Sequence, residues 1–529
     1  MKLTDYTTYA DAQAHYSSAQ LWDLFSGDRE QLNLAYECID RHAAEGDRVA
    51  VRIIRADGND EILTFQQIAS ASSQFAHWLT EQGAQKGDRI CIMLEPSLAF
   101  YAAVFGAIKV GAIAVPLFTL FGPDGVRLRV EDCNPRVLIT NQDKWTTTQG
   151  LDGLAVHLDT DVMEVIQAYP ETYAVASAAN DMAAYQYTSG TTRELPDAVK
   201  HTHRAVVVVC NAALYATGVR PGDRFFCPSS PAWGHGMWHG TFAPLALGVE
   251  TGTFAGKFSP ERLLQALEQY EISNLSAAAT HYRMMMNCGR AGAHNYTIQK
   301  LSFTGEPIDS ETEAYTRNIF RAPVCSIYGT TEIGVILASY PGASDFTVKP
   351  GSLGKAVPGV EVGVLRPDGS HCAPDEIGEL KVRRRDGWLP TRDRGWIDGD
   401  GYFFHAGRAD DVIISAGYTI GAVEVEDTLL KHADVTEAAV IGVADEMRGQ
   451  VVKAFIVSSR AQTETFTAEL QDFVRDRLSA HEYPRQVEVV SALPKTPAGK
   501  VNRKTLRELE ASKTQATSSL SPQAGGGSG

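Results

Sequence analysis

Short apolar segments alternate with longer, helix-length segments through the first two thirds of the chain. The apolar segment 89–94, RICIML, precedes the longer segment 97–111, SLAFYAAVFGAIKVG, and two further apolar segments follow at 112–118 and 136–141. Apolar stretches of about four to eight residues are typical of buried strands, whereas longer ones are typical of helices. This strand–helix–strand order predicts parallel α/β layers.

The same order recurs further along the chain. We expect helices at 203–218 and 259–271 and a buried strand at 272–280. Ser259 is the predicted N-cap of the second helix, because its hydroxyl can accept a hydrogen bond from a backbone N–H of the first turn.

The pattern changes near residue 400. Residues 394–420 are rich in Gly and Asp and contain short β segments, which predicts hairpins and a connection between domains. We therefore expect an α/β protein with a large N-terminal domain of layered α/β subdomains, residues 1–409, and a smaller C-terminal α+β domain, residues 410–512. Residues 513–529 are expected to form a flexible tail, and their final GGGSG is typical of an engineered linker.

Charge and composition exclude several classes of protein. The chain has 529 residues, with 48 Lys and Arg against 64 Asp and Glu and a formal net charge of −16. An acidic chain without a basic cluster is not expected to bind nucleic acid. The short basic stretch 381–388, KVRRRDGW, is expected to be a solvated strand end.

The chain also lacks the signals of a membrane or secreted protein. No segment approaches the run of about 18 apolar residues that a membrane-spanning helix needs, and the N-terminus has no apolar signal region. The eight cysteines show no C-x-x-C spacing, so we expect them to be reduced, buried side chains. These features predict a soluble protein of the cytoplasm with no membrane partner.

The stretch YTSGTTRELPDAVKH, residues 187–201, suggests an anion-binding loop. Its first half contains the small or hydroxyl-bearing residues Thr188, Ser189, Gly190, Thr191 and Thr192. A turn at the glycine can direct successive backbone N–H groups at one anion. The loop lacks the G-x-x-x-x-G-K-[ST] spacing, which disfavours P-loop NTPase chemistry. Taken alone, the composition also fits a surface turn.

Further motifs follow the loop in a fixed order. They are TGEP (304–307), YGTTEIG (328–334), TRDRG (391–395), GRADD (407–411) and PKTPAGKVNR (494–503). In this series the chain resembles the adenylate-forming superfamily of acyl-CoA synthetases, peptide-synthetase adenylation domains and luciferases, from about residue 21 to residue 508. The segments 32–43, 116–124, 407–426 and 448–457 most resemble the acetyl-CoA and medium-chain acyl-CoA synthetase branch.

The resemblance implies a reaction in two steps. A carboxylate first attacks the α-phosphorus of ATP to give an acyl-adenylate and pyrophosphate, and the thiol of coenzyme A then takes the acyl group. Because the negatively charged carboxylate must approach the negatively charged phosphates of ATP, the site needs cations, N–H donors and Mg²⁺ around those phosphates. The resemblance therefore implies ATP, Mg²⁺, coenzyme A and a small-molecule carboxylic acid.

Two residues carry the expected catalysis. Glu332 corresponds to the ligand of Mg²⁺, and Lys500 to the lysine that stabilises the α-phosphate and the attacking carboxylate. An isolated loop Glu or Lys would instead be a solvated surface residue.

The resemblance also implies which residues surround the nucleotide. Gly305, Glu306 and Pro307 correspond to the segment beside adenine, and Asp393 and Arg408 to the ribose contacts. The full expected set is Thr188, Ser189, Gly190, Thr191, Thr192, Arg193, Gly305, Glu306, Pro307, Tyr328, Gly329, Thr330, Thr331, Asp393 and Arg408.

In this superfamily the small domain rotates between the two steps, so the C-terminal domain is expected to be mobile. Asp410 corresponds to the hinge, and Gly417 to the wall of the tunnel through which the coenzyme A thiol enters. A turn glycine is the alternative interpretation of Gly417.

Two positions depart from the pattern of the superfamily. Thr419 stands where the close branch usually has an arginine, and Asp197 replaces the lysine of the opening loop. Arg193, four residues before Asp197, is the best candidate for the compensating cation, because its forked donors suit phosphate oxygens.

The acyl pocket is expected at Trp233, Gly234, His235 and Gly329. Acetate-specific enzymes carry a tryptophan at the position of Gly329, so a glycine there predicts an acid larger than acetate, whether medium-chain, branched or aromatic. Trp233 and His235 equally fit core packing.

Three functions stay open at this point. The first is an AMP-forming acid–CoA ligase; the second is an enzyme that loads an acyl group onto a carrier-protein thiol. The third is a catalytically silent sensor that binds a nucleotide or acyl-CoA, suggested by Asp197 and Thr419. A homodimer, and acetylation of Lys500 by a lysine acetyltransferase, are further hypotheses.

Overall fold

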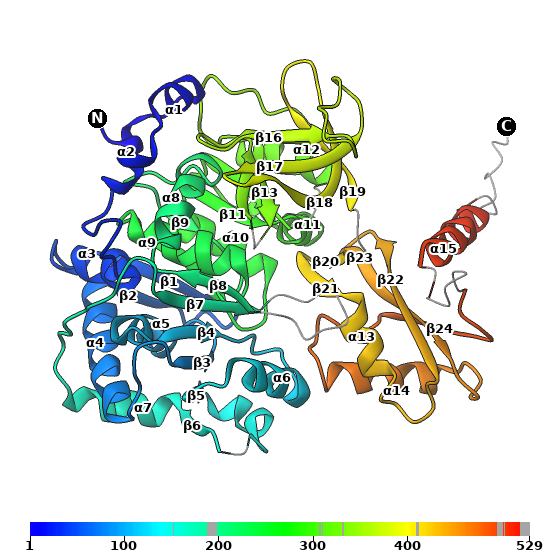
Figure 1. Cartoon of the computed structure of the whole chain (residues 1–529), viewed down its shortest axis with the longest axis horizontal. Helices are drawn as coiled ribbons and strands as arrows, with labels where there is room; N and C mark the ends of the chain where they lie inside the picture. The colour runs from blue at the N-terminus through cyan, green and yellow to red at the C-terminus, as the bar shows by residue number, and fades with distance from the viewer. Residues whose placement is uncertain are drawn as a thin grey trace. The chain divides into compact units, whose positions relative to one another are not determined.

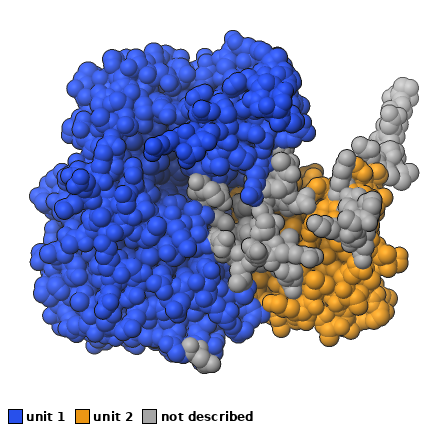
Figure 2. All heavy atoms as spheres, in the orientation of Figure 1, with its two compact units in different colours: residues 1–188, 196–410 blue, residues 189–195, 411–529 orange. Residues whose placement is uncertain are grey.

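The computed structural model describes residues 1–151, 153–187, 198–305, 308, 310–330, 333–408, 412–494, 501 and 503–518. These residues belong to two compact units. Unit 1 comprises the described residues up to 408, and unit 2 those from 412 onward, as Figure 2 shows in blue and orange. The predicted domain boundary at 409/410 lies outside the described residues and stays a prediction.

Within the described residues, a six-stranded sheet of unit 1 confirms the predicted α/β layers. Its order is β6-β5-β3-β4-β7-β8, and the neighbouring strands run parallel except for the antiparallel pair β7 and β8 (Figure 1). The strands are β3 (Arg89–Met93), β4 (Ile113–Pro116), β5 (Val137–Thr140), β6 (Ala155–Leu158), β7 (Met182–Tyr187) and β8 (Ala198–Thr202). The first three lie within the apolar segments predicted to be strands.

The second sheet of unit 1 has 13 strands among the described residues, in the order β16-β17-β18-β19-β15-β14-β13-β12-β11-β9-β10-β1-β2. Its pairs are parallel from β13 to β1 and antiparallel elsewhere. The strands are β1 (Val49–Arg55), β2 (Glu61–Thr64), β9 (Phe225–Phe226), β10 (Thr251–Ala255), β11 (Asn274–Ala278), β12 (Lys300–Thr304), β13 (Val324–Thr330), β14 (Gly334–Ala338), β15 (Ser352–Ala356), β16 (Val362–Leu365), β17 (Gly378–Arg384), β18 (Gly387–Ile397) and β19 (Phe403–Arg408).

Serine side chains cap the first turns of helices α5 and α10 in unit 1. The Ser97 hydroxyl accepts a hydrogen bond from Phe100 N–H at the start of α5, and Ser259 accepts one from Arg262 N–H at the start of α10, as predicted. The α-helices are α1 (Tyr9–His15), α2 (Ser18–Trp22), α3 (Arg41–Ala43), α4 (Phe65–Glu81), α5 (Leu98–Val110), α6 (Pro123–Cys133), α7 (Asp159–Val165), α8 (Ala205–Tyr215), α9 (Ala243–Ala246), α10 (Pro260–Gln269), α11 (Ala279–Asn287) and α12 (Ser310–Phe320). The 3₁₀ helices are η1 (Leu3–Asp5), η3 (Gln142–Thr148), η4 (Ile166–Ala168) and η6 (Ala291–Ala293), and the π helices are η2 (Tyr36–Asp40) and η5 (His235–Phe242).

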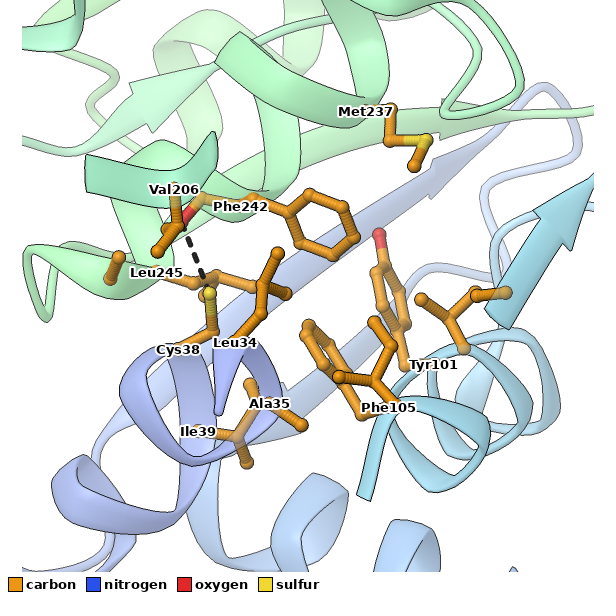
Figure 3. Packing of buried hydrophobic residues seen from close by; sticks show 14 of the residues in the cluster. Leu34, Ala35, Cys38, Ile39, Tyr101, Phe105, Val206, Met237, Phe242 and Leu245 are labelled. Atoms are coloured by element: carbon orange, nitrogen blue, oxygen red, sulfur yellow. Dashed lines mark hydrogen bonds between the residues drawn. The ribbon is translucent and has the colours of Figure 1, made fainter. Parts of the chain in front are cut away.

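The largest hydrophobic core of unit 1 joins side chains of both sheets to helices between them. Figure 3 shows Cys38 and Ile39 of η2 packed near Phe105 of α5 and Phe242 of η5. The Cys38 thiol donates to the Phe242 carbonyl oxygen at 3.4 Å. All eight cysteines are free thiols; the predicted burial is confirmed for six of them, whereas Cys288 and Cys372 are half-buried.

Unit 2 has the predicted α+β character. Among its described residues, five strands form one sheet: β20 (Val412–Ser415), β21 (Tyr418–Gly421), β22 (Glu437–Asp445), β23 (Gly449–Val457) and β24 (Gln486–Val490). Its helices are α13 (Ala422–Leu429), α14 (Glu464–Arg475) and α15 (Arg503–Ser518).

The structure differs from the predicted tail at its beginning. Residues 513–518 continue helix α15, because no Gly or Pro interrupts them and the Lys513 ammonium donates to Glu488 Oε1 at 2.7 Å. Residues 519–529 lie outside the described residues. In the described part of the chain, no helix combines the length and the apolar character needed to cross a membrane.

Candidate active site

The two predicted ribose contacts lie opposite each other on neighbouring strands. Asp393 of β18 and Arg408 of β19 are partners in the antiparallel register. Asp393 is 4% exposed, and its Oδ2 accepts a 2.7 Å hydrogen bond from the hydroxyl of Tyr328 on β13. His405 Nε2 lies 3.5 Å from Oδ1 of the same carboxylate. A buried, oriented carboxylate of this kind is suited to accept hydrogen bonds from vicinal hydroxyls.

The predicted adenine segment follows the adjacent strand. Gly305 comes directly after β12 and takes a φ of +95°, a left-handed conformation that favours glycine. Because β12 and β13 are parallel neighbours, Gly305 and Tyr328 lie toward the same edge of the sheet. In open α/β sheets, ligands bind outside the carboxyl ends of the strands. The fold thus brings two of the predicted nucleotide motifs to one edge.

Gly329 has a structural reason to lack a side chain. The pairing of β13 with β14 shifts register between Tyr328 and Gly329, and Gly329 pairs with Val335. A Cβ on Gly329 would lie 2.0 Å from the carbonyl oxygen of Gly334. Two non-bonded atoms cannot approach so closely, so a side chain does not fit at this position. The close approach of two backbones therefore accounts for this glycine, independently of any open pocket.

The predicted acyl segment contains a buried hydrogen-bond network. His235 Nδ1 lies 2.9 Å from the Ser229 hydroxyl, and Nε2 lies 2.8 Å from the Ser276 hydroxyl. Ser302 Oγ donates in turn to Ser276 Oγ at 2.9 Å. Both ring nitrogens are therefore engaged within the protein, as expected for the core-packing interpretation of His235.

The neighbours of His235 define the rest of this segment. Trp233 is half-buried and meets the His235 ring edge-on, with ring centroids 5.4 Å apart. Gly234, between them, faces the side chain of Gln186 on β7: a Cβ at Gly234 would lie 3.4 Å from Gln186 Oε1. This is an ordinary contact distance, so a methyl group fits there but a larger side chain would press on Gln186.

The histidines of this region are neutral near pH 7. Burial lowers the pKa of His235 well below its usual value, and the neighbouring His239 and His281 lower it further. Burial also lowers the pKa of His239 and of His281 to about 4. These imidazoles therefore provide hydrogen-bonding groups and no positive charge for a phosphate.

In unit 2, Gly417 lies in a two-residue hairpin turn between β20 and β21. Ser415 pairs with Tyr418, and both turn residues, Ala416 and Gly417, have positive φ, at 52° and 78°. This conformation is typical of hairpins that match the twist of their strands. The turn-glycine interpretation of Gly417 thus has a physical basis, and its tunnel role stays a proposal. Thr419 pairs in register with Ile414 on the same hairpin.

One cluster of potential metal ligands exists among the described residues, and none of its members belongs to the predicted motifs. It consists of His432, Asp434 and Glu469 in unit 2. Arg460 already bonds both carboxylates, at 2.8 Å to Asp434 and 3.0 Å to Glu469. The cluster is therefore an ion-pair network.

Comparison with known proteins assigns the chain to a family. The model of the AMP-binding enzyme matches residues 39–387, well over half of the chain, and the model of the AMP-binding enzyme C-terminal domain matches residues 424–500. The chain belongs to the AMP-binding enzyme family.

Relatives of this AMP-binding enzyme extend over almost its whole length. Acetyl-coenzyme A synthetase of Bacillus subtilis is 31% identical over 91% of each chain. The mouse mitochondrial acyl-coenzyme A synthetase ACSM3 is 27% identical over 86% of each chain. The crystal structure of an acyl-CoA synthetase from Brucella canis, 30% identical, covers 96% of this chain and 100% of its own with a TM-score of 0.72. The predicted superfamily is confirmed, and so is the predicted enzyme class, an AMP-forming ligase.

Several predicted residues of the AMP-binding enzyme lie outside the described residues. They are Thr188, Ser189, Gly190, Thr191, Thr192, Arg193, Asp197, Glu306, Pro307, Thr331, Glu332, Asp410 and Lys500. Their assigned roles stay predictions of the motifs.

Two residues of this region were missed by the motifs. His405 lies on β19, the strand after that of Asp393, and its imidazole is 3.5 Å from the Asp393 carboxylate. It belongs to none of the motifs named above. Gln186 is a polar residue in the apolar strand MAAYQY, and this break in the apolar pattern was the available signal.

Proposed function

We propose that this AMP-binding enzyme is an acid–CoA ligase that converts a carboxylic acid larger than acetate, ATP and coenzyme A into an acyl-CoA, AMP and pyrophosphate. The main support is the buried Asp393 carboxylate, bonded to Tyr328 and opposite Arg408 at the predicted ribose position. The two family models, which match in the order expected for adenylation and mobile domains, support the same function.

In the first step, an oxygen of the substrate carboxylate attacks the α-phosphorus of ATP. The new oxygen–phosphorus bond replaces the bond to pyrophosphate, which leaves. Lys500 would stabilise the charge on the α-phosphate, and Glu332 would bind Mg²⁺, which neutralises phosphate charge. Asp393 would hold the ribose hydroxyls and so fix the α-phosphorus relative to the acid.

In the second step, the sulfur of coenzyme A attacks the acyl carbon, and the bond from that carbon to the AMP oxygen breaks. The sulfur gives up its proton, and AMP leaves with both electrons of the broken bond. Gly417 would line the tunnel for the thiol, and Asp410 would be the hinge about which the C-terminal domain turns.

The proposed size of the acid rests on the expected pocket residues. Gly234 has no side chain where it faces Gln186, and Gly329 has none where acetate-specific enzymes have a tryptophan. Gly234 leaves room for a small group beside the expected acyl group, whereas Gly329 supports a larger acid only through the missing tryptophan, because its Cβ would meet the Gly334 backbone. A panel of acids from C2 to C10 together with benzoate-like acids, scored for coenzyme A-dependent AMP formation, tests this proposal.

The same assay separates the alternative functions. Pyrophosphate release without a coenzyme A thioester would support loading of a carrier-protein thiol. No release with any acid would support a silent sensor and overturn the ligase. A location in the cytoplasm and a homodimer remain hypotheses that this assay does not address.

The role of Lys500 gives a sharper test. Lys500→Ala should abolish acid-dependent pyrophosphate release but leave thioester formation from supplied acyl-adenylate largely intact, because the lysine acts only in the first step. Lys495→Ala, a change of a neighbouring lysine, is the matched control and should keep both activities. Normal pyrophosphate release by the Lys500 variant would contradict the assignment. Acetylation of Lys500 removes the same charge and should have the same effect.

A further inference from the structure

Gln186 is a buried amide without a hydrogen-bond partner. Its side chain on β7 is 2% exposed, and neither Oε1 nor Nε2 has a partner among the described residues. Exchanging the two amide atoms does not alter this conclusion, because both lack partners. Buried polar groups are almost always hydrogen-bonded, so an amide of this kind calls for a specific explanation.

The face of β7 that carries Gln186 is turned toward the core of unit 1. Alternate residues of a strand share a face, so Gln186 lies on the same side as Ala184, which packs into that core. Across the strand pair, Ala184 is opposite His201 of β8, whose ring lies 4.5 Å from that of Trp238. Gln186 thus belongs to a buried face shared with β8 and η5.

Two further polar atoms on this face also lack partners in the part of the chain that the structure describes. They are Nε2 of His201 and the indole Nε1 of Trp238. The nearby His235 shows the contrast, because both of its ring nitrogens are engaged by serine hydroxyls. His201 on β8 and Trp238 against it therefore add polar atoms without a described partner to those of the Gln186 amide.

The position of Gln186 connects it to the acyl group. Gly234, an expected residue of the acyl pocket, has no side chain to separate that pocket from the amide, which its Cβ would meet at 3.4 Å. A ligand group that reached Gly234 would therefore reach Gln186.

We propose that Gln186 is a specificity-determining residue that binds a hydroxyl or carboxamide group on the acyl part of the substrate. Such a group can donate to Oε1 and accept from Nε2, which an unsubstituted alkyl or phenyl group cannot. The substrate class is thus a hydroxylated or amide-bearing carboxylic acid. This inference rests on the proposed ligase function and narrows its substrate.

Matched pairs of acids test the proposal. Each acid of the panel is compared with its ω-hydroxy counterpart, and benzoate with 3- and 4-hydroxybenzoate, by coenzyme A-dependent pyrophosphate release. The native enzyme should prefer the hydroxylated member of at least one pair by about tenfold or more in kcat/KM, because an unsubstituted acid leaves the buried amide unpaired. In Gln186→Leu this preference should disappear.

The outcomes separate this proposal from the ligase function. Turnover of acids with no preference for a hydroxylated member, or with the same preference in Gln186→Leu, overturns the role of Gln186 and leaves the ligase intact. No pyrophosphate release with any acid overturns both.

Stability provides a second readout. Gln186→Leu should raise the Tm of the ligand-free protein, because it removes an unpaired buried amide. Asn33 is the matched control, since its buried amide donates to Ile108 O and Ser177 Oγ and accepts from the N–H groups of Ala35 and Tyr36. Asn33→Leu should lower the Tm and keep the acid preference. A Gln186→Leu protein that is less stable than the native enzyme would show that the amide is paired within the fold and would overturn the proposal.

Discussion

Gly234 and Gly329 differ in the space that a side chain would find. At Gly329 the backbone of the paired strand approaches so closely that a Cβ would lie 2.0 Å from the Gly334 carbonyl oxygen. At Gly234 a Cβ would make an ordinary contact at 3.4 Å with the Gln186 amide. The second position is therefore the better place to change the size of the expected acyl pocket.

Gly234→Val should shift acid preference toward shorter chains. Its γ-methyl groups extend beyond a Cβ that already contacts Gln186, so they fill space that a longer acyl group needs. We expect kcat/KM for the longest accepted acid to fall at least about tenfold, or about 1.4 kcal/mol, and that for the shortest acid to change less. Pyrophosphate release across acids from C2 to C10 measures the profile.

Gly234→Ala is the control for this substitution. Its methyl group fits at 3.4 Å, so the chain-length profile should stay close to that of the native enzyme. An unchanged profile in Gly234→Val would show that this position does not face the acyl group.

At the scale of secondary-structure elements, a single buried lysine joins three helices. The Lys109 ammonium on α5 donates to Asp40 Oδ1 of η2 at 2.7 Å, and to Ala69 O and Ser73 Oγ of α4 at 3.1 and 2.9 Å. Burial lowers the pKa of Lys109 and raises the pKa of Asp40, while their mutual attraction opposes both shifts. All three donors of the ammonium are used, which offsets the cost of burying the charge.

Lys109→Met should destabilise unit 1 strongly. The change leaves Asp40 partly buried without its cation, which costs about 3 kcal/mol in the free energy of unfolding, as is typical when one member of a buried ion pair is removed. Denaturant unfolding of the two proteins measures the difference. The double change Lys109→Met with Asp40→Leu should recover part of the lost unfolding free energy. A Lys109→Met protein as stable as the native one would contradict the stabilising role of the buried Lys109–Asp40 pair.

At the scale of the whole molecule, buried histidines link the stability of unit 1 to pH. Burial lowers the pKa of His42, His201 and His203 to about 4. Since the unfolded chain binds protons near pH 6.5 and the folded state does not, the unfolded state holds more protons between pH 6.5 and about 4. Stability must therefore fall as the pH decreases through that window.

His203 provides the test of this pH dependence. It is fully buried, and its Nδ1 accepts a 3.0 Å hydrogen bond from Leu34 N–H. His203→Gln should reduce the loss of unfolding free energy between pH 7.5 and 5.5 by about 1.4 kcal/mol, because glutamine does not titrate. Denaturant unfolding at both pH values measures it, with His15→Gln, an exposed histidine, as the control. An equal loss in the His203 variant and the native protein would refute the linkage.

The amino-acid sequence by itself determined the secondary structure of the central layers and the family. The apolar segments predicted β3, α5, β4 and β5 because strand and helix periodicity are local properties of a chain. The ordered motifs predicted the superfamily through their resemblance to its members, and the family models confirm it.

Only the tertiary structure decided the surroundings of particular side chains. The Tyr328 hydroxyl reaches Asp393 across 65 residues of sequence, and their strands β13 and β18 are separated by three others in the order of the sheet, so only the tertiary fold brings them together. The sequence could not show that Gly329 meets the backbone of Gly334, that His235 is bonded to Ser229 and Ser276, or that Gln186 has no described partner. Such facts depend on which distant segments pack against a residue, and a local pattern of apolar and polar positions carries no record of that packing.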